Sequence, residues 1–278
     1  MTIRIEKESC IRCGKCVQVC PAEIMVRRGT AKEIALVHTD RCIVCGHCVD
    51  VCPTDSVIHS EFPPQTVHAV DEGLLPTPEQ VLLLIRSRRS NRTITPKPIP
   101  EEALQQIIEA ARCAPTASNS RQVSFTLVTD PEQLRRIGDF TIGVFDSTAK
   151  KLMNPVVRTL LKRLRPDLYR YAARFAEMKR EHEAGKDPIL RKATALLIIH
   201  TPASSRFGCE DANLAYQNAS LMAQSLGVSQ IYMGFILTAI RMSKKNAFAR
   251  IAGITGRPQA IMALGIPAFR YPKYTERG

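Results

Sequence analysis

Eight of the ten cysteines lie in two copies of one pattern near the start of the chain. Each copy reads C-x2-C-x2-C-x3-C-P, and the two copies span residues 10–21 and 42–53. Closely spaced thiolates on a short loop can surround a cube of iron and sulfur, while backbone N–H groups point at the anionic sulfur atoms. The sequence therefore predicts iron–sulfur ligation by Cys10, Cys13, Cys16, Cys20, Cys42, Cys45, Cys48 and Cys52.

This spacing resembles that of the bacterial ferredoxins with two [4Fe–4S] clusters. In that family the fourth cysteine of each run ligates the other cluster. The resemblance therefore implies one cluster on Cys10, Cys13, Cys16 and Cys52, and a second on Cys42, Cys45, Cys48 and Cys20. Neither half of such a module would be complete alone.

Zinc and disulfide bonds are the alternative uses of so many cysteines. A structural zinc site takes four ligands, commonly from two CxxC-like pairs. Eight thiolates in two runs, each of three closely spaced cysteines followed by a fourth, do not fit such a site. A disulfide framework needs an oxidising compartment, yet the opening MTIRIEKESC lacks the basic and then apolar segment of a secretory signal. We expect reduced thiolates in a cytoplasmic protein.

The length of 278 residues leaves room for a second domain beside a ferredoxin module, and 45% hydrophobic residues exclude general disorder. No uncharged apolar run approaches the roughly 20 residues that cross a bilayer, so we expect no membrane span. The composition therefore predicts a domain at residues 1–60, a proline-containing linker at 61–77, and a second domain at 78–278.

The formal net charge of +13 is concentrated in the second domain, because residues 1–60 hold 8 basic against 7 acidic residues. Much of the excess lies at 150–192, where basic residues alternate with apolar ones. A solvated helix face is the simplest interpretation. An acidic redox carrier acting as electron donor is the next, and nucleic acid is the least favoured partner.

Hydrophobic periodicity predicts alternating helices and strands in the second domain. Helices are expected from Pro78 to about Arg86, from Pro100 through Ala111, after Asp130-Pro131, and from about Glu210 to Leu226. Strands are expected at 123–128 and 195–199, and near 230–233 and 259–264 on either side of a last helix. This order indicates a layered sheet covered by helices.

A phosphate site is predicted at an arginine-rich turn, residues 86–92 (RSRRSNR). The sequence contains neither G-x-G-x-x-G nor a P-loop, so phosphate must be held in another way. Guanidinium groups are permanently charged and form bidentate hydrogen bonds to phosphate, and Ser90 adds a hydroxyl.

The turn is followed by residues 114–122 (APTASNSRQ) and then a strand, and this combination resembles the FMN-dependent nitroreductase superfamily. The likeness continues in family order through Glu210-Asp211-Ala212, Gln217-Asn218, Leu226-Gly227, Met233-Gly234 and Leu264-Gly265-Ile266-Pro267. The fold class implied is α+β, with an N-terminal ferredoxin-like two-cluster domain and a nitroreductase-type α/β/α layered sheet domain.

The resemblance implies FMN as a cofactor and assigns its contacts. Arg88, Arg89, Ser90 and Arg92 would contact the phosphate and ribityl chain, and Arg277, helped by Lys273, would return to the phosphate. Asn119 would hydrogen-bond the isoalloxazine or ribityl group, with Arg121 or Gln122 near the pyrimidine end. Met233 and Gly234 would present backbone to the flavin.

Two departures from the family pattern affect the substrate face and the dimer. Val123 stands where an aromatic residue often follows the asparagine loop, and the chain has no tryptophan. The chain stops one residue after Arg277, so an arm exchanged between subunits would be short. A homodimer with FMN at the subunit interface is still expected from the resemblance.

The expected activity is an oxidoreductase in which electrons pass from an external donor through two [4Fe–4S] clusters to FMN and then to a small electron-poor acceptor. Nitroaromatics, quinones and activated alkenes are candidate acceptors, and NAD(P)H is a candidate donor. No protein side chain is assigned a catalytic role, because the flavin carries the chemistry. The alternative is an electron-transfer or redox-sensing module that serves a protein partner.

Residues 145–192 are expected to form a variable lid or insert. Tyr169, Tyr171 and Phe175 lie close to helical spacing there. Core packing is their default interpretation, and stacking on a planar substrate is the alternative.

Overall fold

The structure is a computed structural model that describes residues 1–161, 163, 166–243 and 246–276. It divides into two compact units. The first unit contains Met1–Pro76 and Ala117–Ser120, and the second contains Thr77–Thr116 and Arg121–Gly278.

The first unit is built from two antiparallel strand pairs and two short helices. Strand β1 (Ile3–Ile5) pairs with β4 (Val57–His59), β2 (Met25–Arg28) pairs with β3 (Glu33–Leu36), and the helices are α1 (Lys15–Val19) and α2 (His47–Asp50). A small core of Ile24, Met25, Val49 and Val57 includes two of the predicted ligands, Cys16 and Cys48. The cysteine loops are thus folded around a shared interior.

The segment predicted as a linker contains two single-turn 3₁₀ helices, η2 (Pro64–Thr66) and η3 (Glu72–Leu74). The Asp71 side chain caps η3 by accepting a hydrogen bond from the Gly73 N–H at 2.9 Å. Helix α3 (Pro78–Ser87) follows with a capping box at Thr77 and Gln80.

The second unit is organised around one antiparallel sheet. Its strands are β5 (Ile94–Thr95), β6 (Ser124–Val128), β7 (Ala195–Thr201), β8 (Ser229–Tyr232) and β9 (Arg257–Pro267). Strand β7 lies between β6 and β9, and both β5 and β8 also pair with β9. The two strands that flank β7 in this sheet, β6 and β9, therefore come from distant parts of the chain.

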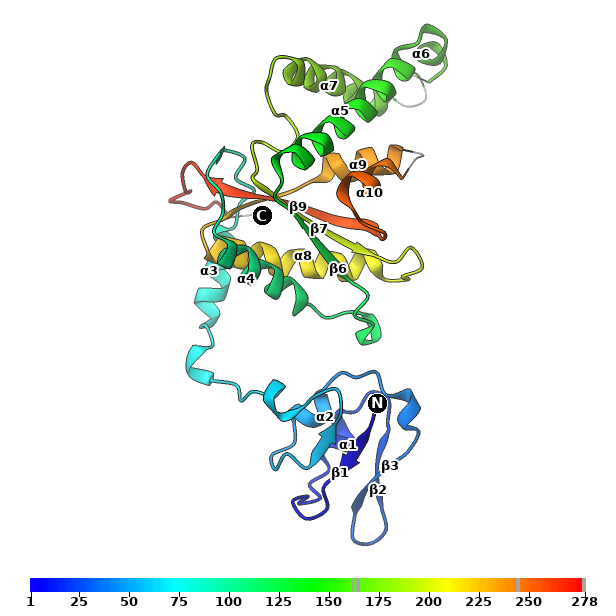
Figure 1. Cartoon of the computed structure of the whole chain (residues 1–278), viewed down its shortest axis with the longest axis vertical. Helices are drawn as coiled ribbons and strands as arrows, with labels where there is room; N and C mark the ends of the chain where they lie inside the picture. Colours follow the sequence, from blue (N-terminus) through cyan, green and yellow to red (C-terminus); the bar gives the residue numbers. More distant parts are fainter. Residues whose placement is uncertain (162, 164–165, 244–245, 277–278) are drawn as a thin grey trace. The chain divides into compact units, whose positions relative to one another are not determined.

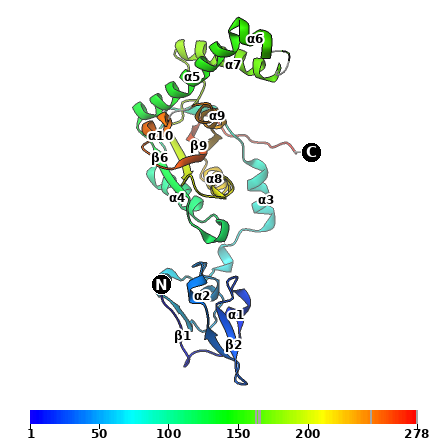
Figure 2. The same ribbon diagram turned by 90° about the vertical axis from the view of Figure 1, so that its right-hand side faces the viewer.

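Helices cover both faces of this sheet (Figure 1). Helices α4 (Glu101–Arg112) and α8 (Gly208–Ser225) pack on one face, below β9 in Figure 2, and α3 contacts α8. Helices α5 (Pro131–Met153), α9 (Gly234–Met242) and α10 (Ala247–Ala252) cover the other face. The second unit is a three-layer α/β/α domain, as the resemblance implied.

Strand alternation explains the two cores. In β7, Ala195, Leu197 and Ile199 belong to the core under α4 and α8, whereas Leu196 and Ile198 belong to the core under α5 and α9. Successive side chains of a strand point to opposite faces, so an all-apolar strand must be covered on both sides.

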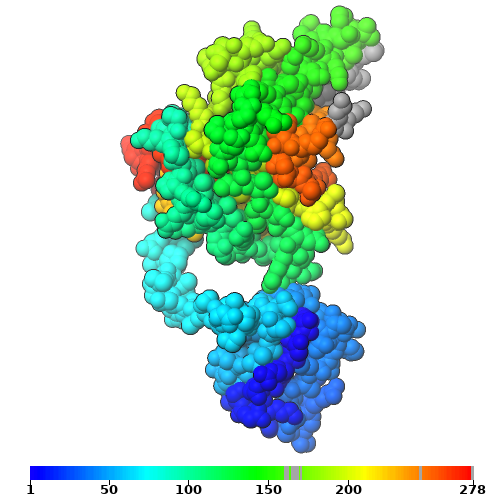
Figure 3. All heavy atoms as spheres, viewed as in Figure 1, coloured from blue at the N-terminus to red at the C-terminus, as the bar shows by residue number. Residues whose placement is uncertain are grey.

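The insert predicted at 145–192 does not begin at an element boundary, because residue 145 lies inside α5. Helices α6 (Pro155–Leu161) and α7 (Pro166–Glu183) follow, and α7 packs along α5 (Figure 3). The rings of Phe145 and Phe175 stack with centroids 4.0 Å apart. Phe175 is therefore a core residue, whereas Tyr171 is 54% exposed.

The other predicted elements are present, with two differences. Strand β9 is longer than predicted, at 11 residues, and two helices, α9 and α10, stand where one was expected. Within the described residues, no helix combines the length and the apolar character needed to cross a bilayer.

Candidate functional site

The eight motif cysteines surround two small cavities in the first unit. Cys10, Cys13, Cys16 and Cys52 line one, and Cys20, Cys42, Cys45 and Cys48 line the other. Each cavity takes three cysteines from one run and the fourth from the other run. This is the crossed grouping that the ferredoxin resemblance implied.

The two cysteine loops share one backbone conformation. Gly14 and Gly46 have φ of 76° and 82° and precede α1 and α2, and Arg12 and Val44 have φ of 55° and 54°. Positive φ at matching positions turns each loop sharply between its ligands, which glycine permits without steric strain. Arg27 lies against Gly14 and donates to the Cys13 carbonyl at 2.6 Å.

Backbone N–H groups donate to two of the ligand sulfur atoms. The Val44 N–H lies 3.4 Å from the Cys42 Sγ, and the Ser56 N–H lies 3.3 Å from the Cys52 Sγ. Such hydrogen bonds stabilise anionic sulfur. They are the kind of contact that tunes the reduction potential of an iron–sulfur cluster.

Three of the predicted ligand thiols have a shifted pKa. Burial raises the pKa of Cys48 to about 11 and also raises the pKa of Cys16, while the neighbouring cysteines add to both shifts. Burial also opposes ionisation of Cys52, but hydrogen bonds from Thr54 and Ser56 together outweigh it and lower its pKa. A buried group of thiolates needs cations to neutralise it, so this donor set fits iron–sulfur clusters.

Asn119 lies in the segment Ala117–Ser120, which groups with the first unit. Its Nδ2 donates to the carbonyl oxygens of Ile43 and Val44 at 2.9 and 2.7 Å. Both Ser118 and Asn119 have positive φ, of 51° and 52°. The predicted contact of Asn119 with FMN stays a prediction.

The arginine turn lies at the end of α3, where Arg88 is the C-cap residue. The Arg89 guanidinium donates to the Arg86 and Arg88 carbonyls at 2.9 and 3.2 Å and approaches the Thr275 carbonyl at 3.5 Å. Arg88, Arg89 and Ser90 are half-buried, and Arg92 is exposed. The turn therefore gathers three guanidinium groups on a short, fixed stretch of backbone.

A buried network of hydrogen bonds connects the arginine turn to β8 and to the segment that follows β9. Gln230 on β8 donates to the Arg89 carbonyl at 3.4 Å and accepts from the Tyr216 hydroxyl at 2.7 Å. Ser229 donates to the Asn91 carbonyl at 2.5 Å, and the Asn91 amide donates to the Phe269 carbonyl at 2.8 Å. Because these groups are buried and satisfied, they fix the turn relative to the sheet.

A cavity of about 140 Å³ opens beside this network. Arg89 and Asn91 line it together with Gly227 and Arg270. Gly227 has φ of 71°, and a Cβ there would collide with the Arg270 guanidinium. The glycine therefore allows a second arginine to reach the cavity that Arg89 lines.

Met233 and Gly234 form the start of α9. Met233 is buried and donates its N–H to the Ile261 carbonyl at 2.9 Å, which fixes the strand-to-helix turn. No side chain of the described residues caps α9, and a Cβ on Gly234 would meet nothing within 4 Å. The N–H groups in the first turn of α9 therefore have no side-chain cap among the described residues.

The remaining predicted contacts lie on exposed segments. Arg121, Gln122 and Lys273 are exposed, and the Arg121 N–H donates to the Thr116 hydroxyl at 3.0 Å. Arg277 lies outside the described residues.

Sequence reasoning did not assign a role to Asn91 within the turn, to the buried Tyr216, Ser229 and Gln230 that support the turn, or to Arg270 in the adjoining cavity. The one signal present was the polar pair Ser229-Gln230 at the start of an otherwise apolar strand. Their contacts join positions up to 178 residues apart.

Comparison with known proteins agrees with both halves of this description. The profile of the nitroreductase family matches residues 85–266, and that of the 4Fe-4S dicluster domain matches residues 2–57. The chain therefore belongs to the nitroreductase family and carries an N-terminal 4Fe-4S domain. It is a flavin-dependent oxidoreductase of the nitroreductase type.

Individual relatives are distant. An FMN reductase [NAD(P)H] of Bacillus subtilis is 26% identical over 56% of this chain and 55% of its own length. A nitroreductase of Bacteroides fragilis, solved with bound FMN, superposes with a TM-score of 0.53 at 22% identity and covers 72% of this chain and 96% of its own. A BluB-like flavoprotein of Clostridium difficile gives a TM-score of 0.54 at 16% identity and covers 71% of this chain and 94% of its own. The last two likenesses show the fold alone.

Proposed function

We propose that the protein passes electrons from an external donor through two [4Fe–4S] clusters and FMN to an electron-poor small molecule. Nitroaromatics, quinones and activated alkenes are the acceptor classes proposed. A compartment that keeps thiols reduced, such as the cytoplasm, suits eight thiolate ligands.

The observation that carries this proposal is the crossed grouping of the cysteines. Two four-cysteine cavities within one compact unit supply ligands for two clusters, and neither set can be completed by one run alone. Two neighbouring clusters give an electron carrier. In the same chain this carrier is joined to a nitroreductase-type unit, which raises the effective concentration of one redox partner for the other.

The arginine turn is the proposed phosphate site of FMN. Arg88, Arg89, Ser90 and Arg92 supply charged and hydroxyl donors, with Lys273 and Arg277 as further cations, and the buried Gln230 fixes the Arg89 carbonyl. Asn119, Arg121 and Gln122 are proposed for the ring and ribityl contacts, and the N–H groups beside Met233 and Gly234 for the ring edge. FMN, when bound, accepts electrons singly and can deliver them as a pair.

We propose a homodimer from the exposed aliphatic residues of α3. Val81, Leu82, Leu83 and Ile85 are each 39–54% exposed in the single chain. A helix with so many exposed aliphatic side chains is suited to a subunit interface. Because the arginine turn directly follows this helix, a partner on α3 would lie close to the proposed phosphate site.

Anaerobic stopped-flow spectroscopy tests the electron route. The cluster- and flavin-loaded protein is mixed with NADH, NADPH or a reduced ferredoxin, and cluster bleaching is followed separately from flavin reduction. We expect the clusters to bleach before the flavin is reduced. Cys10→Ser and Cys42→Ser should each abolish flavin reduction by a donor that passes its electrons to the clusters. Arg89→Gln, with its cysteines intact, should instead lose FMN while keeping its iron.

Direct reduction of the flavin by a nicotinamide, unchanged in both cysteine variants, would contradict the route through the clusters. A reduced protein that is reoxidised only by a partner protein, and not by small acceptors in a saturable way, would favour the electron-transfer module over the enzyme.

A further inference from the structure

One cavity of the second unit lies away from the arginine turn. It has a volume of about 830 Å³ and lies among the ends of β6 and β7, the first turns of α4 and α5, and the turn after α7. This volume is within the range of small-molecule sites. The cavity shares no lining residue with the arginine turn or with the start of α9.

Gly138 keeps one wall of this cavity open. It lies inside α5, is buried, and faces the cavity, yet a Cβ built on it would meet nothing within 4 Å. Glycine is among the least favourable residues in a helix interior, and here it is not needed for a close contact or a positive φ. The missing side chain leaves space that a larger residue would fill.

The walls of the cavity are mostly aliphatic. Leu104, Leu134, Ile189, Leu190 and Ala195 line it and are at most 6% exposed. A set of fixed, buried aliphatic side chains around an open volume favours a ligand with an apolar body.

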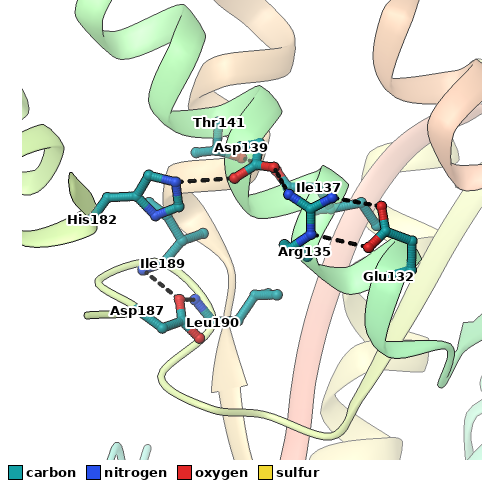
Figure 4. Close-up of polar contacts among 9 residues, drawn as sticks. All are labelled: Glu132, Arg135, Ile137, Asp139, Thr141, His182, Asp187, Ile189 and Leu190. Carbon is teal, nitrogen blue, oxygen red and sulfur yellow. Dashed lines mark hydrogen bonds and ion pairs between the residues drawn. The ribbon is translucent and has the colours of Figure 1, made fainter. Parts of the chain in front are cut away.

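The rim is held in place by polar contacts (Figure 4). Arg135 donates to both Glu132 oxygens at 2.6 and 3.0 Å and to Asp139 at 3.0 Å, and His182 on α7 lies 3.0 Å from the other Asp139 oxygen. This chain of contacts ties α7 to α5 at the edge of the cavity. A guanidinium group has five N–H donors, so two of those on Arg135 are not used by these carboxylates.

The cationic side chains that line this cavity are better placed than its carboxylates to contact a ligand. The Asp187 carboxylate already accepts from the N–H groups of Ile189, Leu190 and Lys192 at 2.8–3.2 Å. Lys186 lines the cavity and makes no ion pair with the residues that the structure describes. Glu101, at the start of α4, is the remaining carboxylate of the lining, and the second unit as a whole carries a large basic excess.

We propose that this cavity binds a small amphipathic anion, with its apolar body beside Gly138 and its carboxylate or similar head at Lys186 and Arg135. The proposal does not depend on the flavin or on the electron route. It gives the second unit a ligand site that shares no residue with the proposed flavin contacts.

Isothermal titration calorimetry on the full chain, loaded with clusters and flavin, tests this site with 2-naphthoate as the probe. Gly138→Leu fills the cavity and should weaken naphthoate binding by at least about tenfold. Gly143→Leu is the matched control, because Gly143 lies on the same helix, is exposed, and also has open space at its Cβ. The affinity of the Gly143→Leu protein for naphthoate should stay within about twofold of the wild-type affinity.

The head group is tested with Lys186→Gln. Loss of one charge-assisted contact should weaken naphthoate binding by about tenfold and leave binding of the neutral 2-naphthylmethanol unchanged. Lys186 is exposed, so this variant is expected to fold even if Gly138→Leu does not. Thermal unfolding checks that each variant is folded.

Three results would overturn the proposal: no naphthoate binding to the wild type at millimolar concentration, equal binding to the Gly138→Leu and Gly143→Leu proteins, or tighter binding of 2-naphthylmethylammonium than of naphthoate. If naphthoate still perturbs the flavin spectrum in the folded Gly138→Leu protein, the probe binds at the flavin instead.

Discussion

At the scale of single residues, the proposed flavin site depends on groups that do not touch the flavin. Tyr216 is 7% exposed, and its hydroxyl donates to Gln230, which in turn holds the Arg89 carbonyl. A buried polar pair of this kind is stable only while each group keeps its partner. The position of the arginine turn is therefore linked to a tyrosine on α8.

Tyr216→Phe should lower the free energy of unfolding by about 1–2 kcal/mol, because it leaves the Gln230 oxygen buried without its donor. The dissociation constant for FMN should rise, since Gln230 is then free to rotate away from Arg89. Tyr232→Phe is the control: the Tyr232 hydroxyl donates to Asn213 at 3.3 Å, and the side chain is 41% exposed. Urea unfolding and FMN titration measure both effects, and equal losses in the two variants would contradict the argument.

The same tyrosine predicts a pH dependence. Burial raises the pKa of the Tyr216 phenol, against a weaker opposing effect of Arg88. The unfolded chain titrates this group near its usual pKa of about 10, whereas the folded protein keeps it protonated. Its contribution to stability is therefore complete below about pH 10 and is lost as pH rises further. The stability advantage of wild type over Tyr216→Phe should therefore stay constant up to about pH 9 and shrink as pH rises above about 10 in urea titrations.

The 4Fe-4S domain could be predicted from the sequence because the information in the cysteine runs is local. The spacing of the cysteines within each run identifies the chemistry, and the loop glycines at 14 and 46 lie between the ligands. The support of the arginine turn could not be predicted in this way. Asn91, Tyr216 and Gln230 come from three elements, and only the folded sheet brings them together.

At the scale of elements, the largest buried side chain that attaches α7 to the domain is Phe175, with Met178 of the same helix also in the core. Phe175 stacks on Phe145 and is 3% exposed, whereas Tyr171, one turn earlier on the same helix, is 54% exposed. Ion pairs add contacts between the same helices, such as Lys179 with Asp146 at 3.2 Å. Such partly exposed pairs contribute little compared with a buried aromatic side chain.

Phe175→Ala should lower the free energy of unfolding by about 3–5 kcal/mol, because it removes a large buried ring and leaves a cavity against Phe145. Tyr171→Ala should change it by less than about 0.5 kcal/mol. Urea unfolding gives both values, and limited proteolysis should show faster cleavage after residue 155 only in the Phe175 variant. A large effect of Tyr171→Ala on substrate KM, with no loss of stability, would instead support a pocket role for that ring.

The secondary structure was predictable where the pattern is strong. The continuous apolar run at 195–199 becomes β7, buried on both faces, and Asp130-Pro131 begins α5 with a side-chain cap at 2.7 Å. The pairing of β9 with three strands could not be read from periodicity, because it depends on contacts between distant segments. The division of the expected last helix into α9 and α10 likewise could not be read from the pattern.

At the scale of the whole molecule, the positive charge falls mainly on the second unit, but part of it is paired. Lys150 lies 2.8 Å from Asp146, and Arg174 contacts Glu177 at 2.5 Å. Lys151 and Arg158 make no ion pair with the described part of the chain. Paired charges favour a solvated helix surface, and the unpaired ones are the candidates for docking an acidic donor.

Reduction by an acidic ferredoxin should therefore slow by about tenfold or more as ionic strength rises from about 0.02 to 0.5 M, because salt screens long-range attraction. The Lys151→Glu/Arg158→Glu double variant should show a lower rate at low salt and a weaker salt dependence. The control is the turnover rate of a neutral quinone, which should change little with ionic strength. Equal salt slopes for the wild type and the double variant would exclude this surface as the docking site.

The crossing of the cysteine runs makes the N-terminal sequence a single cooperative unit, and iron content tests it. Cys16 and Cys52 line one cavity, whereas Cys20 lines the other. If the fourth ligand crosses, Cys16→Ala/Cys52→Ala should lose about half of the iron, as Cys16→Ala does alone, because both changes remove the same cluster. Cys16→Ala/Cys20→Ala should lose nearly all of it. Uncrossed runs require the reverse, with about half of the iron kept in Cys16→Ala/Cys20→Ala and nearly all of it lost in Cys16→Ala/Cys52→Ala. Iron per folded protein, measured after anaerobic reconstitution, therefore decides between the two connections.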